Sequence, residues 1–324
     1  FKPMLYGYLL RSGYNLATPL KNMPIVIDSG GVDEWRPRNE DKSTSPYVSM
    51  QYAIQHSVNL AAAYAVTELT NADSVASFAK TCGIESELLA YPSLALGTSD
   101  VSPLEMATAY SVFASGGYLN KPWAIVSIKD KSGRVYYRGG TSREQVLDED
   151  TAYLMTYALQ QVVNHGTGYA VRRYYRGQTA GKTGTTSNSV DAWFVGYNSE
   201  LSTAIWVGND TASKRLNASF GYGGTACAPM FGMMYQELAK NHYPGMNKGF
   251  TKPETVQEAE FCLETGMLAT ENCTQKVKLP FNSHYMPEYC SKHLLEYIED
   301  AMTNTDVDDK HDTEESDDLD NKQE

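Results

Sequence analysis

Two β-rich runs late in the chain, among segments with a helical pattern, constrain the fold more than any other feature. The runs are DAWFVGY at 191–197 and LSTAIWVG at 201–208, and three polar residues join them. Aromatic and β-branched residues in two short runs with a tight connection predict an antiparallel hairpin. A helix is expected next, over about 229–240. Strands of this kind among helices predict the α+β class, with an antiparallel sheet packed between helices.

Two earlier segments carry the end signals of helices. In SPLEMATAYSVFASGG, Ser102 is a predicted N-cap, Glu105 completes a capping box, and Gly116 or Gly117 can take the left-handed stop. The segment DEDTAYLMTYALQQVVNHG begins with acidic residues, which suit the positive end of a helix dipole, and it ends at Gly166. Both segments are predicted helices.

Charge argues against nucleic acid as a partner, and composition predicts how the chain divides into domains. A net charge of -12 argues against nucleic acid, because phosphate binding needs clustered Lys and Arg. With 42% hydrophobic residues, the 324-residue chain can bury one large core, or form a large domain and a small one. We expect a large domain over 1–243, a small extension over 244–295, and an acidic tail over 296–324 that is too polar to fold.

The cysteines form an isolated pair and a late group: Cys82 and Cys227, then Cys262, Cys273 and Cys290. Small apolar packing is the expected role of the isolated pair. In the late group, a disulfide is plausible in an oxidising compartment. A metal site from Cys273, Cys290 and His293 would need a fourth ligand, and no partner is obvious. The disulfide is therefore favoured, and no metal is expected.

The triplet Lys182-Thr183-Gly184 begins the strand-rich region and is the strongest local motif. A Lys on an edge strand is usually solvated and protects that edge, so the triplet alone is a weak signal. A Lys beside a Gly also lets a ligand lie against the backbone. Hydroxyls from Thr183 and Thr185 would then be within reach of a carboxylate.

Ser57 and Asn59 form a second motif between two apolar helical stretches. Taken alone, Ser57 is best interpreted as a helix cap. However, an SxN motif followed after about 120 residues by KTG is the order found in serine acyltransferases. Ser77 and Lys80 also spell SxxK, but they follow SxN in an ordinary amphipathic helical pattern, so we reject them as the catalytic motif.

These motifs, with LGTSDVSPLEMATAYSVFASGGYLNKP, TGMLATENC and EYCSKH, make nearly the whole chain similar to the transpeptidase domain of class A penicillin-binding proteins, the bifunctional peptidoglycan synthases. The resemblance assigns that domain to 1–243. In this family the nucleophilic serine begins an SxxK motif that continues as Lys-Pro, often with Phe before the Lys. Phe1, Lys2 and Pro3 match its end. The expected serine therefore lies three residues before Lys2, outside this sequence, and this chain by itself should be inactive.

The resemblance also implies a role for each motif residue. Lys2 would be the base, Ser57 would pass a proton to the leaving D-alanine, and Asn59 would bind the peptide or orient Lys2. Lys182 would attract the terminal carboxylate of the substrate, which Thr183 and Thr185 would position. The Thr185 N–H, with that of the serine, would form the oxyanion hole.

The implied function is DD-transpeptidation of D-Ala-D-Ala stem peptides through a serine acyl-enzyme, without a cofactor. β-Lactams would acylate the same serine. The family further implies an extracytoplasmic parent protein, anchored by an upstream transmembrane helix and carrying a glycosyltransferase domain. It also implies a disulfide between Cys273 and Cys290. It leaves the oligomeric state open.

Two alternatives remain. A carboxypeptidase or β-lactamase would hydrolyse the acyl-enzyme, but a class A β-lactamase needs a Glu that primes water, and no motif for it is recognisable. A catalytically silent module that binds muropeptides or β-lactams is disfavoured because six motif residues occur together: Lys2, Ser57, Asn59, Lys182, Thr183 and Gly184.

Overall fold

The computed structural model describes residues 1–27, 34–40, 43–140, 142–186, 189–209, 214–217, 220–246 and 248–294. The acidic tail expected over 296–324 lies outside these residues. The α-helices are α1 (Lys2–Arg11), α2 (Met50–His56), α3 (Asn59–Tyr64), α4 (Ala72–Thr81), α5 (Pro103–Ala114), α6 (Glu149–His165) and α7 (Cys227–Lys240). The strands are β1 (Pro19–Lys21), β2 (Tyr47–Ser49), β3 (Tyr118–Asn120), β4 (Ser127–Lys129), β5 (Val135–Arg138), β6 (Arg143–Gln145), β7 (Ala180–Thr185), β8 (Asp191–Tyr197), β9 (Ser202–Gly208), β10 (Val256–Cys262) and β11 (Lys276–Asn282).

The central sheet has the order β7-β8-β9 and is antiparallel throughout. The hairpin predicted from the two β-rich runs is confirmed as β8 and β9. Strand β7, which carries the KTG triplet, has β8 as its one strand neighbour among the described residues, so it is an edge strand. Lys182 pairs with Val195 and Gly184 with Trp193. The outer side of β7 therefore keeps backbone groups that a ligand strand can pair with.

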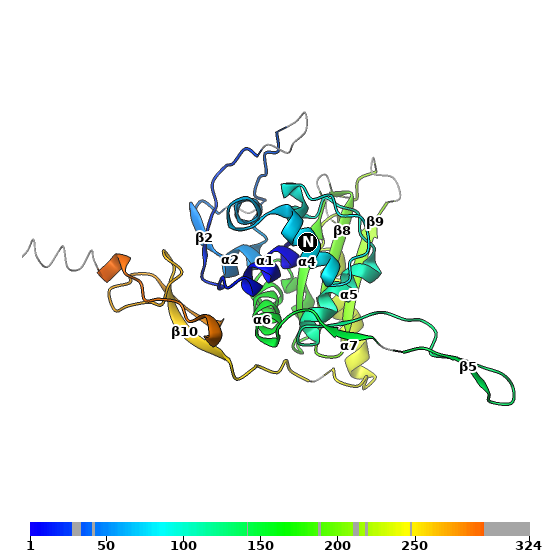
Figure 1. The fold of residues 1–324 in the computed structure, drawn as a ribbon. Coiled ribbons are helices and arrows are strands. Elements are labelled where there is room, and N and C mark those ends of the chain that lie inside the picture. The colour runs from blue at the N-terminus through cyan, green and yellow to red at the C-terminus, as the bar shows by residue number, and fades with distance from the viewer. Residues whose placement is uncertain are drawn as a thin grey trace, which may run out of the picture.

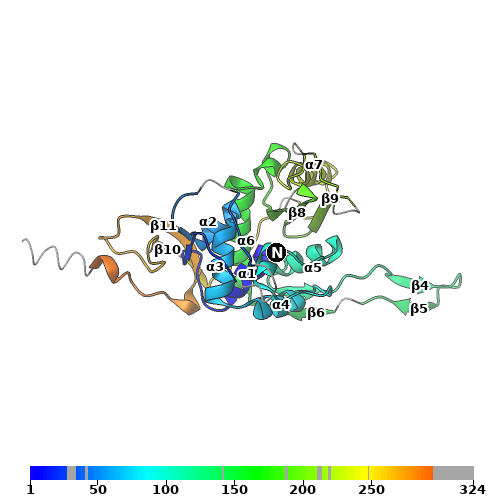
Figure 2. The ribbon, with the colours of Figure 1, turned by 90° about the horizontal axis from the view of Figure 1, so that it is seen from above.

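Helices cover both faces of this sheet, as Figures 1 and 2 show. Successive side chains of a strand point to opposite faces. Accordingly, Tyr197 packs against Tyr110 of α5, with ring centroids 6.4 Å apart, and its hydroxyl contacts Thr156 of α6 at 3.0 Å. On the other face, Phe194 lies 4.9 Å from Phe231 of α7 between ring centroids. The α+β class with a sheet between helices is confirmed.

Helix α1 lies in the middle of the main core. Met4, Leu5 and Leu9 are completely buried, and α2, α4 and α6 pack around the helix. Because α1 is covered on all sides, its orientation is strongly constrained by packing, and the Lys at its first turn is held with it.

The helix ends predicted from sequence are confirmed. Ser102 and Glu105 form both hydrogen bonds of the capping box on α5, and Gly116 has a positive φ of 71° just after that helix. Asp148 caps α6 by accepting a hydrogen bond from the Thr151 N–H, and α6 ends at the expected Gly166.

After α7 the chain crosses the body and forms the antiparallel hairpin of β10 and β11 beside α6 (Figure 1). Its apolar residues Phe261 and Phe281 belong to the main hydrophobic core. The Asn15 side-chain amide donates to the Gly266 carbonyl at 3.2 Å, and the Thr255 hydroxyl donates to the Asp150 carboxylate. The extension is thus docked on the body by both apolar and polar contacts.

Another hairpin, β4 with β5, projects far from the body in both views (Figures 1 and 2). None of the helices in the described part of the chain combines the length and apolar character needed to span a bilayer.

Candidate active site

Lys2 stands in the first turn of α1 with only 7% of its surface exposed, and three oxygen atoms surround its Nζ. Nζ donates to the Ser57 carbonyl at 2.6 Å, to Ser57 Oγ at 3.1 Å and to Asn59 Oδ1 at 2.6 Å. Two motifs separated by more than fifty residues in sequence thereby meet at one nitrogen atom. The structure brings together Lys2, Ser57 and Asn59, as the family resemblance implies.

Ser57 has an unusual backbone conformation that produces this arrangement. It ends α2 with φ 60° and ψ 38°, in the left-handed region that L-residues other than Gly, Asn and Asp seldom occupy. Ser57 is not the cap that the SxN motif taken alone would favour, because Val58 holds the N-cap position of α3. Strain of this kind concentrates at functional sites, and here it directs both oxygens of Ser57 toward Lys2.

Asn39 supports the second motif and was missed in the sequence. Its Oδ1 accepts hydrogen bonds from the backbone N–H groups of Asn59 at 3.0 Å and Leu60 at 2.9 Å. The first turn of α3 is thus capped by a residue from a distant loop. The Asn59 side chain in turn donates to the Arg38 carbonyl at 2.8 Å, which orients its Oδ1 toward Lys2. No local pattern around Asn39 distinguishes it from a loop Asn.

Lys182 lies in β7 and is 4% exposed. Its Nζ donates to the Thr183 carbonyl at 3.1 Å and to Thr183 Oγ1 at 3.4 Å. Burial lowers the pKa of Lys182 from 10.5 to about 7, because the charged ammonium loses hydration. An anion bound beside this group would restore its charge, so the lysine is suited to bind a carboxylate.

The threonines of β7 are held by other segments. Thr183 Oγ1 lies 2.7 Å from Thr167 Oγ1, a contact that the sequence did not indicate. Thr185 Oγ1 accepts a hydrogen bond from the Gly223 N–H at 3.2 Å. Gly223 lies so close to β7 that a Cβ there would stand 2.5 Å from the Gly184 carbonyl oxygen. The loop before α7 therefore fixes the end of β7.

The two halves of the site lie near each other at the start of α1. Lys182 and Lys2 both lie within electrostatic reach of the Phe1 backbone nitrogen. Ser77 and Lys80, the rejected SxxK pair, are instead exposed on α4.

The five cysteines differ in their surroundings. Cys82 and Cys227 are completely buried, in agreement with the expected packing role. Cys273 and Cys290 are not bonded to each other in the structure, so the disulfide expected between them stays a prediction. Cys262 and His293 share the same small space with them.

Most of the chain is similar in sequence to one family of known proteins. The penicillin-binding protein transpeptidase domain matches residues 1–236. Penicillin-binding protein 1A of Neisseria lactamica is 34% identical over 264 residues, which cover 79% of this chain and 32% of that protein. The chain therefore spans about a third of the length of this relative.

Solved structures with the same fold include penicillin-binding protein 1A from Haemophilus influenzae, with a TM-score of 0.77 and 25% identity over 88% of this chain and 47% of that one. The penicillin-binding protein PonA1 from Mycobacterium tuberculosis has a TM-score of 0.66 and 23% identity over 78% of this chain and 69% of that one, a likeness in fold alone.

Proposed function

This chain belongs to the penicillin-binding protein transpeptidase family, and from that premise we propose that it forms most of the active site of a peptidoglycan DD-transpeptidase. The nucleophile in this proposal is a serine three residues before Lys2 in the full-length protein. The observation that carries the proposal is the contact of Lys2 Nζ with Ser57 Oγ at 3.1 Å and Asn59 Oδ1 at 2.6 Å.

Acylation begins with Lys2 as base. An amine that has lost one proton keeps two N–H donors, which suffice for the Ser57 carbonyl and Asn59 Oδ1. Its lone pair can then take the proton of the serine hydroxyl. The serine oxygen bonds to the carbonyl carbon between the two D-alanines of a stem peptide. The C–N bond breaks, and the leaving D-alanine amine takes its proton through Ser57 Oγ.

Transfer reverses these steps with a different amine. An amino group of a neighbouring stem peptide attacks the acyl carbon, the bond to the serine oxygen breaks, and the serine recovers a proton. No oxidant, metal or cofactor is needed to balance either step. A β-lactam carbonyl would be attacked in the same way, which makes β-lactams proposed ligands of this site.

Lys182 and the outer edge of β7 hold the substrate. The substrate's terminal carboxylate would lie beside the Lys182 ammonium and the hydroxyls of Thr183 and Thr185. The Thr185 N–H, with that of the upstream serine, would stabilise the oxyanion. Gly184 leaves the strand free of a side chain where the peptide approaches, so its backbone can pair with β7.

Several features of the whole protein are also only proposed, because this chain spans about a third of the length of the relatives it matches. They are an upstream glycosyltransferase domain, a membrane anchor, and an extracytoplasmic position at the site of cell-wall synthesis. The division into a transpeptidase domain at 1–243 and an extension from 244 is likewise proposed, supported by the family match that ends at residue 236.

The experiment uses the full-length protein with a lipid-linked peptidoglycan precursor that carries D-Ala-D-Ala. Cross-linked stem peptides and released D-alanine are both measured, with penicillin as inhibitor. We expect cross-links that disappear in Lys2→Met, with the exposed Lys80→Met as control. D-alanine release without cross-links would instead support the carboxypeptidase alternative. Penicillin binding without either product would support the silent binding module.

A further inference from the structure

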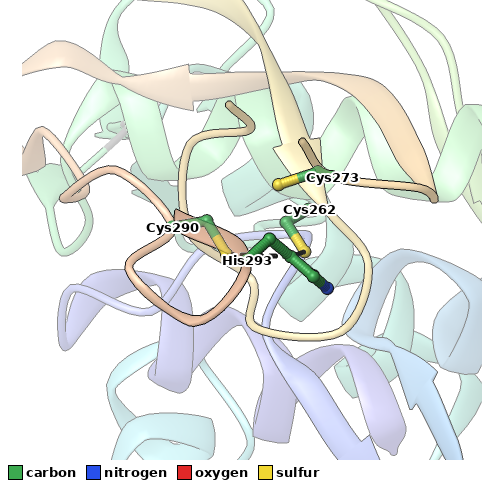
Figure 3. Close-up of side chains that lie close together, drawn as sticks. All are labelled: Cys262, Cys273, Cys290 and His293. Atoms are coloured by element: carbon green, nitrogen blue, oxygen red, sulfur yellow. Dashed lines mark hydrogen bonds between the residues drawn. The ribbon is translucent and has the colours of Figure 1, made fainter. Parts of the chain in front are cut away.

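A buried cluster of three cysteines and one histidine lies in the extension, away from the proposed active site. Cys262 ends β10, Cys273 lies in the loop before β11, and Cys290 and His293 lie after β11. Their exposed surfaces are 0%, 4%, 1% and 6% respectively. The four potential ligand atoms all lie within 4.8 Å of one another. Figure 3 shows the three sulfur atoms and the imidazole gathered in one space.

We propose that Cys262, Cys273, Cys290 and His293 bind one Zn²⁺ ion in a closed, tetrahedral structural site. Three thiolates and one imidazole are a ligand set that zinc prefers, and four protein ligands leave no open position for catalysis. Binding forms three Zn–S bonds and one Zn–N bond. The three thiol protons pass to solvent, and no electron is transferred.

The distances within the cluster fit this geometry. Bond lengths of about 2.3 Å to sulfur and 2.0 Å to nitrogen in a tetrahedron place a ligand sulfur and a ligand nitrogen about 3.5 Å apart. His293 Nδ1 lies 3.6 Å from Cys262 Sγ and 3.3 Å from Cys290 Sγ. The imidazole nitrogen is therefore spaced from two sulfur atoms as a zinc ligand would be.

The other atoms around the cluster support the ligands. The second imidazole nitrogen, Nε2 of His293, lies 3.5 Å from Glu264 Oε1. A carboxylate on the far nitrogen of a histidine is the usual outer partner of a zinc ligand, because it fixes the tautomer. The Thr270 N–H points to Cys273 Sγ at 3.3 Å, and this contact would stabilise a thiolate.

The fold explains how the ligands meet. Leu268 bridges to Phe261 on one side and to Tyr289 on the other. The Cys290 N–H donates to the Leu268 carbonyl at 2.8 Å. Cys262 directly follows Phe261, and Cys290 directly follows Tyr289. The two bridges to Leu268 therefore bring these cysteines close together.

A disulfide accounts for the cluster less well. It would use two of three neighbouring sulfur atoms and would leave the third thiol and the buried imidazole without a role. A zinc ion uses all four groups. It would also stabilise the loops beside the hairpin, where a separate small core consists of only the three cysteines with Met267 and Ala269.

The test measures zinc in the full-length protein, purified without added metal or a chelating resin, by inductively coupled plasma mass spectrometry. We expect about one zinc per chain, reduced at least about tenfold in Cys262→Ser. Cys82→Ala, which removes a buried thiol outside the cluster, should keep its zinc. His293→Cys should also keep it, because four thiolates form a complete zinc site.

Cobalt provides a second measurement that remains informative if Cys262→Ser folds poorly. Co²⁺ titrated into the metal-free protein should give the intense thiolate absorption of a tetrahedral site in wild type and His293→Cys, whereas His293→Ala, which keeps three of the four ligands, should need a much higher Co²⁺ concentration to reach it. Zinc content that is unchanged in Cys262→Ser would overturn the proposal. So would a metal-free protein, whether its thiols are free or Cys273 and Cys290 are recovered as a linked pair. None of these outcomes bears on the transpeptidase proposal, which is tested by cross-linking.

Discussion

Lys182 is the residue whose environment differs most from that of an ordinary lysine. It is almost completely buried, and loss of hydration lowers its pKa to about 7. A protein keeps such a group at a cost in stability, since a neutral side chain of the same size would avoid the desolvation. In our proposal the Lys182 side chain becomes fully protonated when a carboxylate binds beside it.

We expect Lys182→Ala to slow acylation of the full-length protein by penicillin by about 100-fold, the loss typical of removing a preorganised electrostatic group. Stopped-flow measurement with a fluorescent penicillin checks this. Lys80→Ala, on the exposed face of α4, is the control and should acylate at the wild-type rate. A rate for Lys182→Ala within a few fold of wild type would remove Lys182 from the site.

The same residue predicts a pH dependence of stability. Between pH 7 and 10.5, Lys182 is mainly neutral when folded and mainly protonated when unfolded. The unfolded state then binds more protons, so this residue makes stability rise with pH across that window. Lys182→Met lacks this contribution. Relative to the variant, the wild-type domain should gain about 1 to 2 kcal/mol between about pH 7 and pH 9. Urea unfolding followed by tryptophan fluorescence measures the difference, and parallel pH profiles would contradict it.

At the scale of elements, strand β7 depends on the loop that packs on its end. A Cβ at Gly223 would stand 2.1 Å from the Trp193 carbonyl oxygen and 2.5 Å from that of Gly184. The Gly223 N–H also donates to Thr185. Glycine is required here by the close approach of two backbones and not by a turn.

Gly223→Ala should therefore displace the loop or the strand and cost about 1 to 3 kcal/mol, as overpacking does. We also expect slower acylation, because the carboxylate site lies on the displaced strand. Thermal unfolding and penicillin labelling measure the two effects. Gly140→Ala is the matched control, since a Cβ there has no atom within 4 Å. Equal behaviour of the two variants would show that β7 does not depend on this loop.

At the scale of the whole molecule, α1 connects the site to the core. The helix is buried on nearly all sides, so packing holds Lys2, which lies in its first turn, in a fixed position. The catalytic geometry is therefore set by core packing as much as by the motif residues.

One prediction concerns residues 1–324 expressed by themselves. Once circular dichroism shows that they are folded, they should form no covalent adduct with fluorescent penicillin, since the proposed nucleophile precedes Phe1. A longer chain that includes this serine should label with about one penicillin per chain. Changing that serine to Ala should abolish the labelling. Comparable labelling of the shorter chain at Ser57 or Ser77 would mean that the motifs were aligned wrongly.

Local features were predictable from the sequence because they depend on neighbouring residues. The capping box of Ser102 and Glu105 and the cap at Asp148 join groups within one turn of helix. The hairpin of β8 and β9 follows from two runs and a short connection. The motif residues were identified by their order along the chain, and all of them lie within the region 1–236 that the family model matches.

Contacts between distant residues were decided only by the tertiary structure. Asn39 caps α3 across a loop, and Ser57 takes a left-handed conformation that no neighbouring residue requires. Cys262 meets Cys290 and His293 because Leu268 forms one bridge to Phe261 of β10 and another to Tyr289. From the sequence, Cys273, Cys290 and His293 were recognisable as three possible metal ligands. Cys262 was not recognisable as the fourth, because its distance in space from the others depends on the path of the folded chain. The sequence determines the chemistry of each side chain, whereas packing of the whole core decides which side chains contact one another.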